Sequence, residues 1–546
     1  IDCFDSLLFA ISPAEAPALD PQERLLLESA WACLEDAGYT AENLLRENLR
    51  VGVFIGAMWN DYQSHGAQVW ESRGRVEEFS HHASLANRIS FLFNFCGPSV
   101  AINTSCSSGM TALHFACESV RRGECDAALV GGVNLVSHAY HARMLETIDF
   151  LSKEDTCRPF SAQANGWILG EGVGTVLIKP AAAAVRQRDH VYALIKGSAI
   201  GHSGRTMRYG APSAQQQERM IRQALTDAAL APDDIDYVEA AAPGAAMADA
   251  AEISAVKAVF GARKTMASCY VGTVKANVGH LESASLFSQL TKVLYQMRDR
   301  QLAPSLNSRP RNPLIALDGT GLSIVEKLTP WVSGQDVERP LRAMINAVGA
   351  AGSEGHLVLE EYLGAARQPE TDSLTIVPLS AATEPQLRQQ AQQLLDFLSR
   401  APNARLVDIA FTLQLGRVAM IERLALVVAD TAALRVALSA WHSGDEQHPG
   451  VWRSRAERAA QAAPVEVELQ KWEQHWVSGG KLDWDRLQTG AAQRLSQPTY
   501  PFERVSHWIG RTADAAQPQV LQQTPPMQEH DAANAQLQDS VLAHLL

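Results

Sequence analysis

The sequence predicts a layered α/β domain followed by a smaller α/β unit. Apolar runs such as VGVFIGA (51–57) and AALVGGVNLV (127–136) lack polar alternation, which is typical of strands buried on both faces. These runs alternate with helical stretches, which indicates sheets covered by helices. Hydrophobic residues make up 46% of the 546 residues and charged residues 20%, so the chain can form a large buried core.

The first expected helix follows Asp20-Pro21 and ends at Gly38. One of its faces carries Leu25, Leu26, Ser29, Ala30 and Cys33. A second series of elements begins near residue 191 with the strand VYALIKGSAIG, a helix from about 213 to 229, and the strands in DYVEAAA and CYVGTV. The order of these elements resembles that of the first half, although identity between the halves is too weak to establish an internal repeat.

The C-terminal part has a different character. After a loop-like stretch at 364–375, the runs IVPLSA and LALVVAD predict strands, and EPQLRQQAQQLLDFLSR predicts a helix between them. The prolines and aromatic residues of PTYPFERVSHWIG (498–510) predict an extended strap on another surface. Residues 511–546 are rich in Gln, Pro and Ala and predict a disordered linker or the start of another domain. The predicted divisions are therefore 1–363, 364–510 and 511–546.

Composition argues against several classes of function. The chain has 47 Lys and Arg against 60 Asp and Glu, a net charge of −13, so it lacks the basic excess that nucleic-acid binding requires. No apolar run approaches the roughly 18 to 20 residues that span a bilayer, and no signal-peptide pattern is present. The 8 cysteines are scattered without a CxxC pair, which favours reduced thiols over a disulfide framework or a zinc site. We expect a cytoplasmic protein without a metal, nucleic-acid or membrane partner.

Cys106 is the candidate nucleophile. Val100 to Ile102 predict a strand and Ser107 to Arg122 a helix, so Cys106 lies at their junction. There the helix dipole should lower the pKa of the thiol, and backbone N–H groups can bind an oxyanion. Thioester exchange needs this arrangement. Local sequence alone leaves an equal alternative, because a free cysteine is often only a small core residue.

A resemblance decides between these interpretations. NTSCSSGMTALHFACESVRRGECDAALVGGVN resembles the active-site segment of polyketide ketosynthases, members of the thiolase-like condensing enzymes. Matching segments follow the same order over nearly all of residues 1–363, among them HASLANRISFLFNFCGPS, CRPFSAQANGWILGEGVG, VGTVKANVGHLESAS and GAAGSEGHLVLEEY. The resemblance implies a five-layered αβαβα ketosynthase domain, whose opening strand would precede the first residue here. The remainder resembles the linker subdomain that follows such ketosynthases.

One expected catalytic residue is missing. In the family, two histidines assist the cysteine: one opens a His-Gly-Thr-Gly-Thr motif, and the other ends a Lys-x-x-x-Gly-His run. The second survives as Lys275 and His280, whereas Ala241 stands where the first histidine belongs, within AAPGAAMA. A methyl group can neither donate a hydrogen bond nor carry charge. Decarboxylative condensation needs positioned donors for the enolate, so we expect this step to be lost while acylation of Cys106 persists.

Other positions also depart from the family pattern. Ser161 and Asn165 replace aspartates, Val348 replaces a phenylalanine thought to gate the pocket, and Glu354 replaces an asparagine. These changes indicate a remodelled pocket or relaxed selection for condensation.

Two retained residues are expected to support the site. They are Glu171, which lies near the lysine in the family, and Gly349 of GAAGSEGH. The glycine-rich runs GEGVG and GAAG lack nucleotide-binding spacing. The remaining histidines of interest have no visible partner in the sequence and are expected to be structural or at the surface: His81, His82, His138, His141, His202 and His356.

Three functions remain open. The chain is a non-elongating acyltransferase of a modular polyketide synthase, a catalytically dead docking or gating module, or a condensing enzyme with an unrecognised substitute for the histidine. Retention of Cys106, Lys275 and His280 favours the first. The resemblance also implies a homodimer, an acyl carrier protein that supplies the phosphopantetheine arm, no cofactor on this chain, and an acyltransferase acting in trans.

Overall fold

A four-stranded sheet forms the N-terminal half of the fold. Its strands stand in the order β2 (Ser99–Ile102), β1 (Val51–Gly56), β3 (Ala127–Asn134) and β4 (Gly172–Ile178). The first three are parallel and β4 is antiparallel to β3. Helices α1 (Pro21–Asp36) and α4 (His82–Phe93) pack on one face of this sheet. The runs expected to be buried strands are therefore β1 and β3, and every residue of both is buried.

A six-stranded sheet forms the second half. Its order is β5 (Ala193–His202), β12 (Ser353–Glu361), β11 (Arg342–Val348), β6 (Tyr237–Glu239), β7 (Cys269–Gly272) and β9 (Leu322–Ile324). Here β7, β6 and β11 are parallel and β12 is antiparallel to β11, which repeats the pattern of the first sheet. Helices α8 (Ala214–Asp227) and α9 (Ala246–Phe260) cover its outer face. The two halves thus share the arrangement that their element order suggested.

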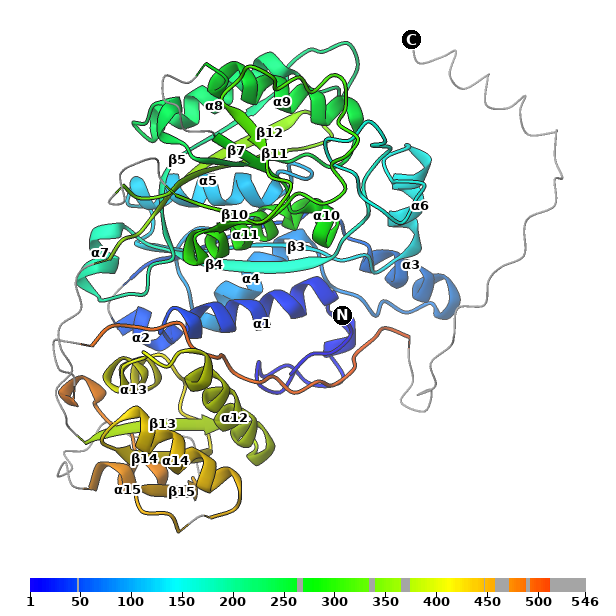
Figure 1. Cartoon of the computed structure of the whole chain (residues 1–546). Coiled ribbons are helices and arrows are strands. Elements are labelled where there is room, and N and C mark those ends of the chain that lie inside the picture. The colour runs from blue at the N-terminus through cyan, green and yellow to red at the C-terminus, as the bar shows by residue number, and fades with distance from the viewer. Residues whose placement is uncertain are drawn as a thin grey trace. The chain divides into compact units, whose positions relative to one another are not determined.

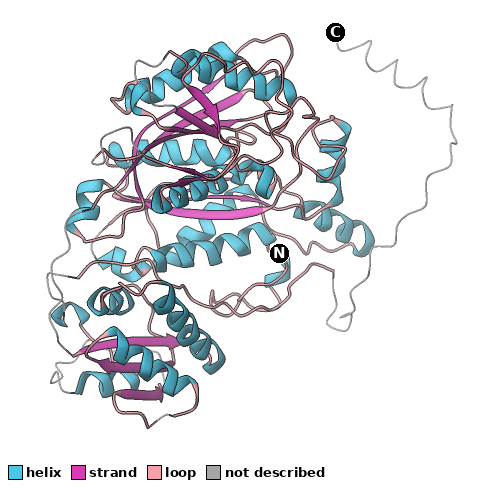
Figure 2. Ribbon diagram, viewed as in Figure 1, coloured by secondary structure: helices cyan, strands magenta, loops and turns pink. Residues whose placement is uncertain are grey.

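Between the sheets lie α5 (Ser108–Arg121) and α11 (Ser285–Asp299), which contact strands of both. Helix, sheet, helix, sheet and helix therefore form five layers (Figure 2). This confirms the predicted fold. The middle layer is held by apolar residues of both helices and both sheets, including Leu113, Leu290, Val130 and Leu357.

Short elements connect these layers. They are η1 (Ala16–Ala18), α2 (Ala41–Arg46), α3 (Tyr62–Arg73), α6 (Ala139–Thr147), α7 (Ala181–Arg186), η2 (Pro232–Asp234), α10 (Lys275–Val278), η3 (Glu282–Ala284), β8 (Gln301–Leu302) and β10 (Thr329–Pro330). Three of them, α6, α10 and η3, carry residues of the site described below.

The linker subdomain has its own sheet and core. Strands β13 (Thr375–Ala381), β14 (Glu422–Val428) and β15 (Val451–Arg455) form an antiparallel sheet. Its helices are α12 (Glu384–Arg400), α13 (Leu406–Leu415), α14 (Thr431–His442), α15 (Trp472–Val477) and η5 (Trp484–Leu487). Both predicted strands and the predicted helix are present, and α12 matches the expected segment at both ends.

The strap at 498–510 packs along α1, as its composition suggested (orange in Figure 1). The Tyr500 N–H donates to the Glu35 carboxylate at 2.7 Å, and Arg24 Nη1 donates to the His507 carbonyl at 2.7 Å. Because the strap covers the outer side of α1, that helix is buried nearly all round. The single apolar face predicted for α1 was therefore too narrow, since Leu27 and Leu34 are buried as well.

The computed structural model describes residues 1–46, 49–262, 269–332, 339–364, 374–445, 447–456, 471–487 and 492–510. Most of the predicted loop at 364–375 and all of the predicted linker at 511–546 lie outside these residues. Residues Ile1–Ile509 form one compact unit. Within the described ranges, no helix combines the length and apolarity needed to cross a bilayer.

Candidate active site

Cys106 lies in a sharp turn between β2 and α5. Ser105 has a left-handed backbone with φ +56°, and the Asn103 side chain accepts its N–H at 3.1 Å. A non-glycine residue in this conformation is uncommon and is often found where a reactive side chain must be aimed. The turn leaves Cys106 directly before the first residues of α5 and only 6% exposed. The structure thus places the cysteine at the strand-to-helix junction inferred from sequence.

The protonation of Cys106 differs from the sequence-based expectation. Burial and, to a smaller extent, the charge of Glu282 raise the pKa of the thiol to about 12. The Ala350 N–H, the Lys275 charge and the Cys106 N–H act in the opposite direction. The prediction of a lowered pKa was wrong because it considered the helix dipole without the cost of burying a thiolate.

Gly349 allows a second backbone N–H group to reach the sulfur. A Cβ on Gly349 would stand 3.0 Å from the Thr104 carbonyl, closer than packed atoms normally approach. The loop is fixed in place by Ser353, whose hydroxyl contacts that of Ser107 at 2.9 Å. The N–H groups of Ala350 and Cys106 therefore converge on the thiol. Two such donors form an oxyanion hole for a thioester carbonyl under attack.

Lys275 connects the cysteine with Ala241, the position where the resemblance led us to expect a histidine. Its ammonium group is buried and donates to the Ala241 carbonyl. Burial lowers the pKa of Lys275, while the nearby Glu252 raises it. The positive charge of Lys275 in turn lowers the pKa of both Cys106 and His280. These four positions thus meet in one buried site.

His280 is held as a neutral hydrogen-bond donor. Its Nδ1 accepts the Glu282 N–H at 3.1 Å and contacts the Ser285 hydroxyl at 2.9 Å. Because Nδ1 is an acceptor, the proton of the neutral ring belongs on Nε2. Burial and the charge of Lys275 keep the pKa of His280 well below its usual value. The Nε2–H can therefore donate to a developing negative charge.

The loop around Ala241 is firmly held although the histidine is absent. The Glu252 carboxylate accepts the N–H groups of Ala241 and Ala242, each at 2.8 Å. Asp249 accepts the Gly244 N–H at 3.2 Å, and Gly244 adopts φ +87°. Ala241 is 4% exposed. The backbone around the Ala241 methyl group is thus held by hydrogen bonds to Glu252 and Asp249.

The Glu171 side chain bonds the segment after β3. Its side chain is exposed and accepts the Val136 N–H at 2.8 Å. The carboxylates that raise the pKa of Lys275 are those of Glu252 and Glu239. Glu171 therefore supports the segment after β3. Glu252 is the carboxylate whose charge has the largest effect on the pKa of Lys275.

The remaining departures are distributed around the site. Ser161 is buried and donates to the Pro310 carbonyl at 3.0 Å, and the Asn165 side chain accepts from Ser152 at the surface. Val348 pairs with Glu354 in the β11–β12 register. Neither Glu354 oxygen has a hydrogen-bond partner among the described residues, and burial raises the pKa of this carboxyl to about 7. Glu354 is therefore protonated in a large fraction of the molecules near neutral pH.

Sequence reasoning missed two parts of the site. One is the Ala350 N–H, which no side-chain pattern reveals. The other is the pair of partners of His141, a residue for which the sequence showed no partner and which is fully buried between Asp61 and Glu282. Its partners are 80 and 141 positions away in the sequence, so only the folded chain brings them together.

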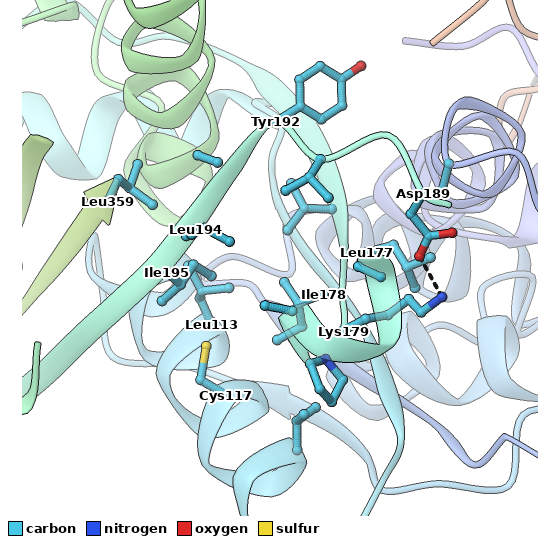
Figure 3. Close-up of a pocket in the computed structure, with 18 of the residues that line it drawn as sticks. Leu113, Cys117, Leu177, Ile178, Lys179, Asp189, Tyr192, Leu194, Ile195 and Leu359 are labelled. Atoms are coloured by element: carbon cyan, nitrogen blue, oxygen red, sulfur yellow. Dashed lines mark hydrogen bonds and ion pairs between the residues drawn. The ribbon is translucent and has the colours of Figure 1, made fainter. Parts of the chain in front are cut away.

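A separate apolar cavity of about 320 Å³ lies between α5, β4 and β5 (Figure 3). Its walls include Leu113, Cys117 and Ile195, and at its edge Lys179 and Asp189 form an ion pair of 2.7 Å. Burial raises the pKa of Cys117 to about 12. None of the residues of the candidate site lines this cavity.

Comparison with known families agrees with this architecture. Residues 1–184 match the N-terminal domain of β-ketoacyl synthases, and residues 192–309 match the C-terminal domain. Residues 378–445 match the RhiE-like, KS-MAT linker domain. These matches cover most of the five-layered fold and part of the linker subdomain.

Similar proteins include long polyketide synthases. Polyketide synthase PksM of Bacillus subtilis (strain 168) is 40% identical over 538 residues, which cover 93% of this chain and 13% of that protein. Polyketide synthase ThaG of Burkholderia thailandensis is 37% identical over 94% of this chain and 10% of its own length. The chain therefore spans only a small part of these relatives.

Solved structures match over most of their length. The oxazolomycin ketosynthase domain OzmH KS7 of Streptomyces albus JA3453 is 35% identical with a TM-score of 0.86, covering 93% of this chain and 87% of that one. The ketosynthase from module 6 of the bacillaene synthase of Bacillus subtilis 168 is 31% identical with a TM-score of 0.83, covering 93% and 90%. The chain belongs to the β-ketoacyl synthase family and is a ketosynthase domain of the type found in modular polyketide synthases, with its linker subdomain.

Proposed function

We propose that this ketosynthase accepts an acyl chain on Cys106 from an acyl carrier protein and passes it on without elongating it. The observation that carries the proposal is the contrast between two parts of one site. The thiol and its two backbone N–H donors are present, whereas a methyl group stands at Ala241.

Acyl loading requires only groups that the chain retains. The Cys106 sulfur attacks the thioester carbonyl of the phosphopantetheine-bound chain, and a new carbon–sulfur bond forms. The bond to the carrier thiol breaks, and that thiol leaves with the proton given up by Cys106. The N–H groups of Cys106 and Ala350 stabilise the oxyanion of the intermediate. Reversal of the same steps on a second carrier passes the chain onward.

Elongation requires more. When a malonyl thioester loses carbon dioxide, negative charge develops on the thioester oxygen and needs positioned donors. His280 offers Nε2–H, but Ala241 offers none. Loss of one such donor typically costs about 10² to 10³ in rate.

The neighbours of Ala241 are poorly suited to replace the histidine. Glu252 is an acid whose two carboxylate oxygens already accept the N–H groups of Ala241 and Ala242. Lys275 donates to the Ala241 carbonyl and is buried. Both groups are occupied with holding the loop, which favours the non-elongating enzyme over a condensing one.

The same proposal assigns partners. Acyl carrier proteins supply and receive the chain and carry the phosphopantetheine arm, so this chain needs no cofactor of its own. A trans-acting acyltransferase would serve modules that elongate. We also propose that the domain works as a homodimer.

The test is transfer between two distinguishable carrier proteins. The purified domain is mixed with one acyl carrier that bears a short acyl chain and a second carrier in its free thiol form. Intact-mass spectrometry is expected to show an acylated domain and then acylated second carrier, and Cys106→Ala is expected to abolish both. Cys117→Ala, which removes a thiol outside the site, serves as the control. Absence of acylation in the parent protein would favour a docking or gating module instead.

A further inference from the structure

A buried row of hydrogen bonds adjoins the candidate site and takes no part in the loading steps. The Asp61 carboxylate contacts His141 Nδ1 at 2.9 Å, and the Glu282 carboxylate contacts His141 Nε2 at 2.7 Å. None of the three side chains is more than 5% exposed. They come from the segment before α3, from α6 and from η3.

The geometry fixes the charge of His141. A carboxylate accepts at each of its ring nitrogens, so both nitrogens must donate and the ring is an imidazolium. Asp61 and Glu282 are the charged groups that act on it, and they raise the pKa of His141 to about 9 although burial opposes this. The chain therefore keeps a positive charge buried beside Glu282 at neutral pH.

Trp59 completes the arrangement. Its indole Nε1–H donates to the same Glu282 oxygen at 2.9 Å. Its ring lies over His141, with 4.1 Å between ring centroids and 34° between planes. An aromatic face stabilises a cation in this position. Glu282 Oε2 thus receives two donors, and its carboxylate has little freedom to move.

Glu282 reaches the reactive groups in two ways. Its backbone N–H donates to His280 Nδ1 at 3.1 Å, which places the ring proton on Nε2. Glu282 also adopts a left-handed backbone, with φ +41°. Its carboxylate charge also raises the pKa of Cys106. One residue therefore orients the histidine and disfavours the thiolate.

We propose that His141 is a positioning residue for acyl transfer, which holds Glu282 in its strained place and offsets the Glu282 charge so that Cys106 stays reactive. This rests on the proposed loading function, but it concerns the reactivity of the thiol itself. His141 touches neither the thiol nor the acyl chain. Its effect passes through Glu282.

The test measures the alkylation rate of Cys106 by iodoacetamide, followed by peptide mass spectrometry, between about pH 7 and 9.5. His141→Gln removes the positive charge but keeps a side chain that can hydrogen-bond. We expect about tenfold slower labelling at pH 8, because one unit of thiol pKa is a tenfold change in thiolate. Glu282→Gln removes the opposing negative charge and is expected to label faster than the parent protein. In the double variant the two effects should cancel to within about threefold of the parent rate.

The matched control is His138→Gln, just before the same helix, where the side chain caps the Tyr140 N–H at the surface. It should leave the rate and its pH profile unchanged. Circular dichroism and melting temperature establish that each variant is folded. The proposal is overturned if His141→Gln labels at the parent rate, or if the folded double variant is as slow as His141→Gln.

If His141→Gln fails to fold, the labelling rate of Glu282→Gln alone tests the proposal. Faster labelling of Cys106 supports the charge balance, and an unchanged or slower rate overturns it. Alkylation needs no carrier protein, so this outcome is separate from that of the transfer assay. A parent protein that alkylates as predicted but is never acylated would refute the loading function and leave only the effect of His141 on the reactivity of the thiol.

Discussion

The reactivity of Cys106 depends on a balance between burial and nearby positive charge. Burial raises the pKa of the thiol to about 12, and the charge of Lys275 and two backbone N–H groups oppose this. At neutral pH the thiol is therefore mostly protonated in the free site. Neutral His280 offers a donor at Nε2. The site therefore favours a protonated thiol that attacks a polarised thioester carbonyl, and it disfavours a permanently ionised thiolate.

Removing the positive charge of Lys275 should slow the alkylation of the Cys106 thiol. Alkylation of Cys106 in the parent protein is expected to rise about tenfold per pH unit from about pH 7 to 10, since this range lies below the thiol pKa. Lys275→Met should label more slowly at neutral pH, and the difference should shrink at high pH because burial lowers the pKa of Lys275 itself. Lys196→Met, which removes a partly exposed lysine paired with Glu360, is the control. A Lys275→Met variant that labels as fast as the parent at pH 7 would contradict the assignment.

At the level of elements, the site is assembled by the turn before α5 and the loop between β11 and β12. Gly349 lets the loop approach the turn, so that the Ala350 N–H reaches the Cys106 sulfur. The loop is also held by the Ser353 hydroxyl, which donates to the Thr104 carbonyl at 2.6 Å. Acyl transfer thus depends on how closely two distant segments pack.

Gly349→Ala should separate these segments. The added Cβ would stand 3.0 Å from the Thr104 carbonyl, so the loop must shift and carry the Ala350 N–H away. We expect acylation of Cys106 to fall by about 10² or more, as when an oxyanion donor is removed. Ala350→Gly keeps the N–H and adds no atoms, so it should retain most activity. Equal acylation rates for Gly349→Ala and the parent protein would show that the second donor is dispensable.

Local sequence patterns predicted helices and strands better than they predicted the contacts between distant segments. Helix α12 was predicted residue for residue, because Thr383 caps it and its apolar side chains recur at helical spacing. The burial of further residues of α1, such as Leu27 and Leu34, was missed, because the covering strap comes from residues 498–510. Cys106 and His280 could be selected from motifs. The Ala350 donor and the partners of His141 could not, because they depend on contacts between segments far apart in the chain.

For the whole molecule, one edge of the four-stranded sheet offers a surface for self-association. Strand β2 is the edge strand, and no described strand pairs with its outer side. Large apolar side chains are exposed on or near it: Phe91 at 80%, Phe115 at 46% and Val100 at 41%. An exposed, apolar strand edge is a template for pairing with a second copy. The predicted homodimer therefore has a specific candidate interface.

A charge on this edge should disrupt the dimer. We expect the parent protein to show twice the chain mass by light scattering at micromolar concentration, and Val100→Arg to show a single chain. Val185→Arg, at an even more exposed position on α7 (53%), should remain dimeric. A dimer that survives Val100→Arg would place the interface elsewhere.

Elongation is the step on which the proposed role of the whole domain depends. The loop at Ala241 keeps its hydrogen bonds to Glu252 and Asp249 but presents a methyl group where the family has an imidazole. In the proposed mechanism, acylation uses the N–H donors of Cys106 and Ala350, which an alanine at position 241 leaves untouched. We therefore expect this protein to be acylated on Cys106 without elongating the acyl chain.

The most direct measurement supplies malonyl-loaded carrier protein to the Cys106-acylated domain and searches by mass spectrometry for a β-ketoacyl chain extended by two carbons. A family member with both histidines is run in parallel under the same conditions. The account predicts an acylated Cys106 and an extended product at a rate at least about 10² below that of the two-histidine enzyme. An extended product formed by this domain at a comparable rate would contradict it.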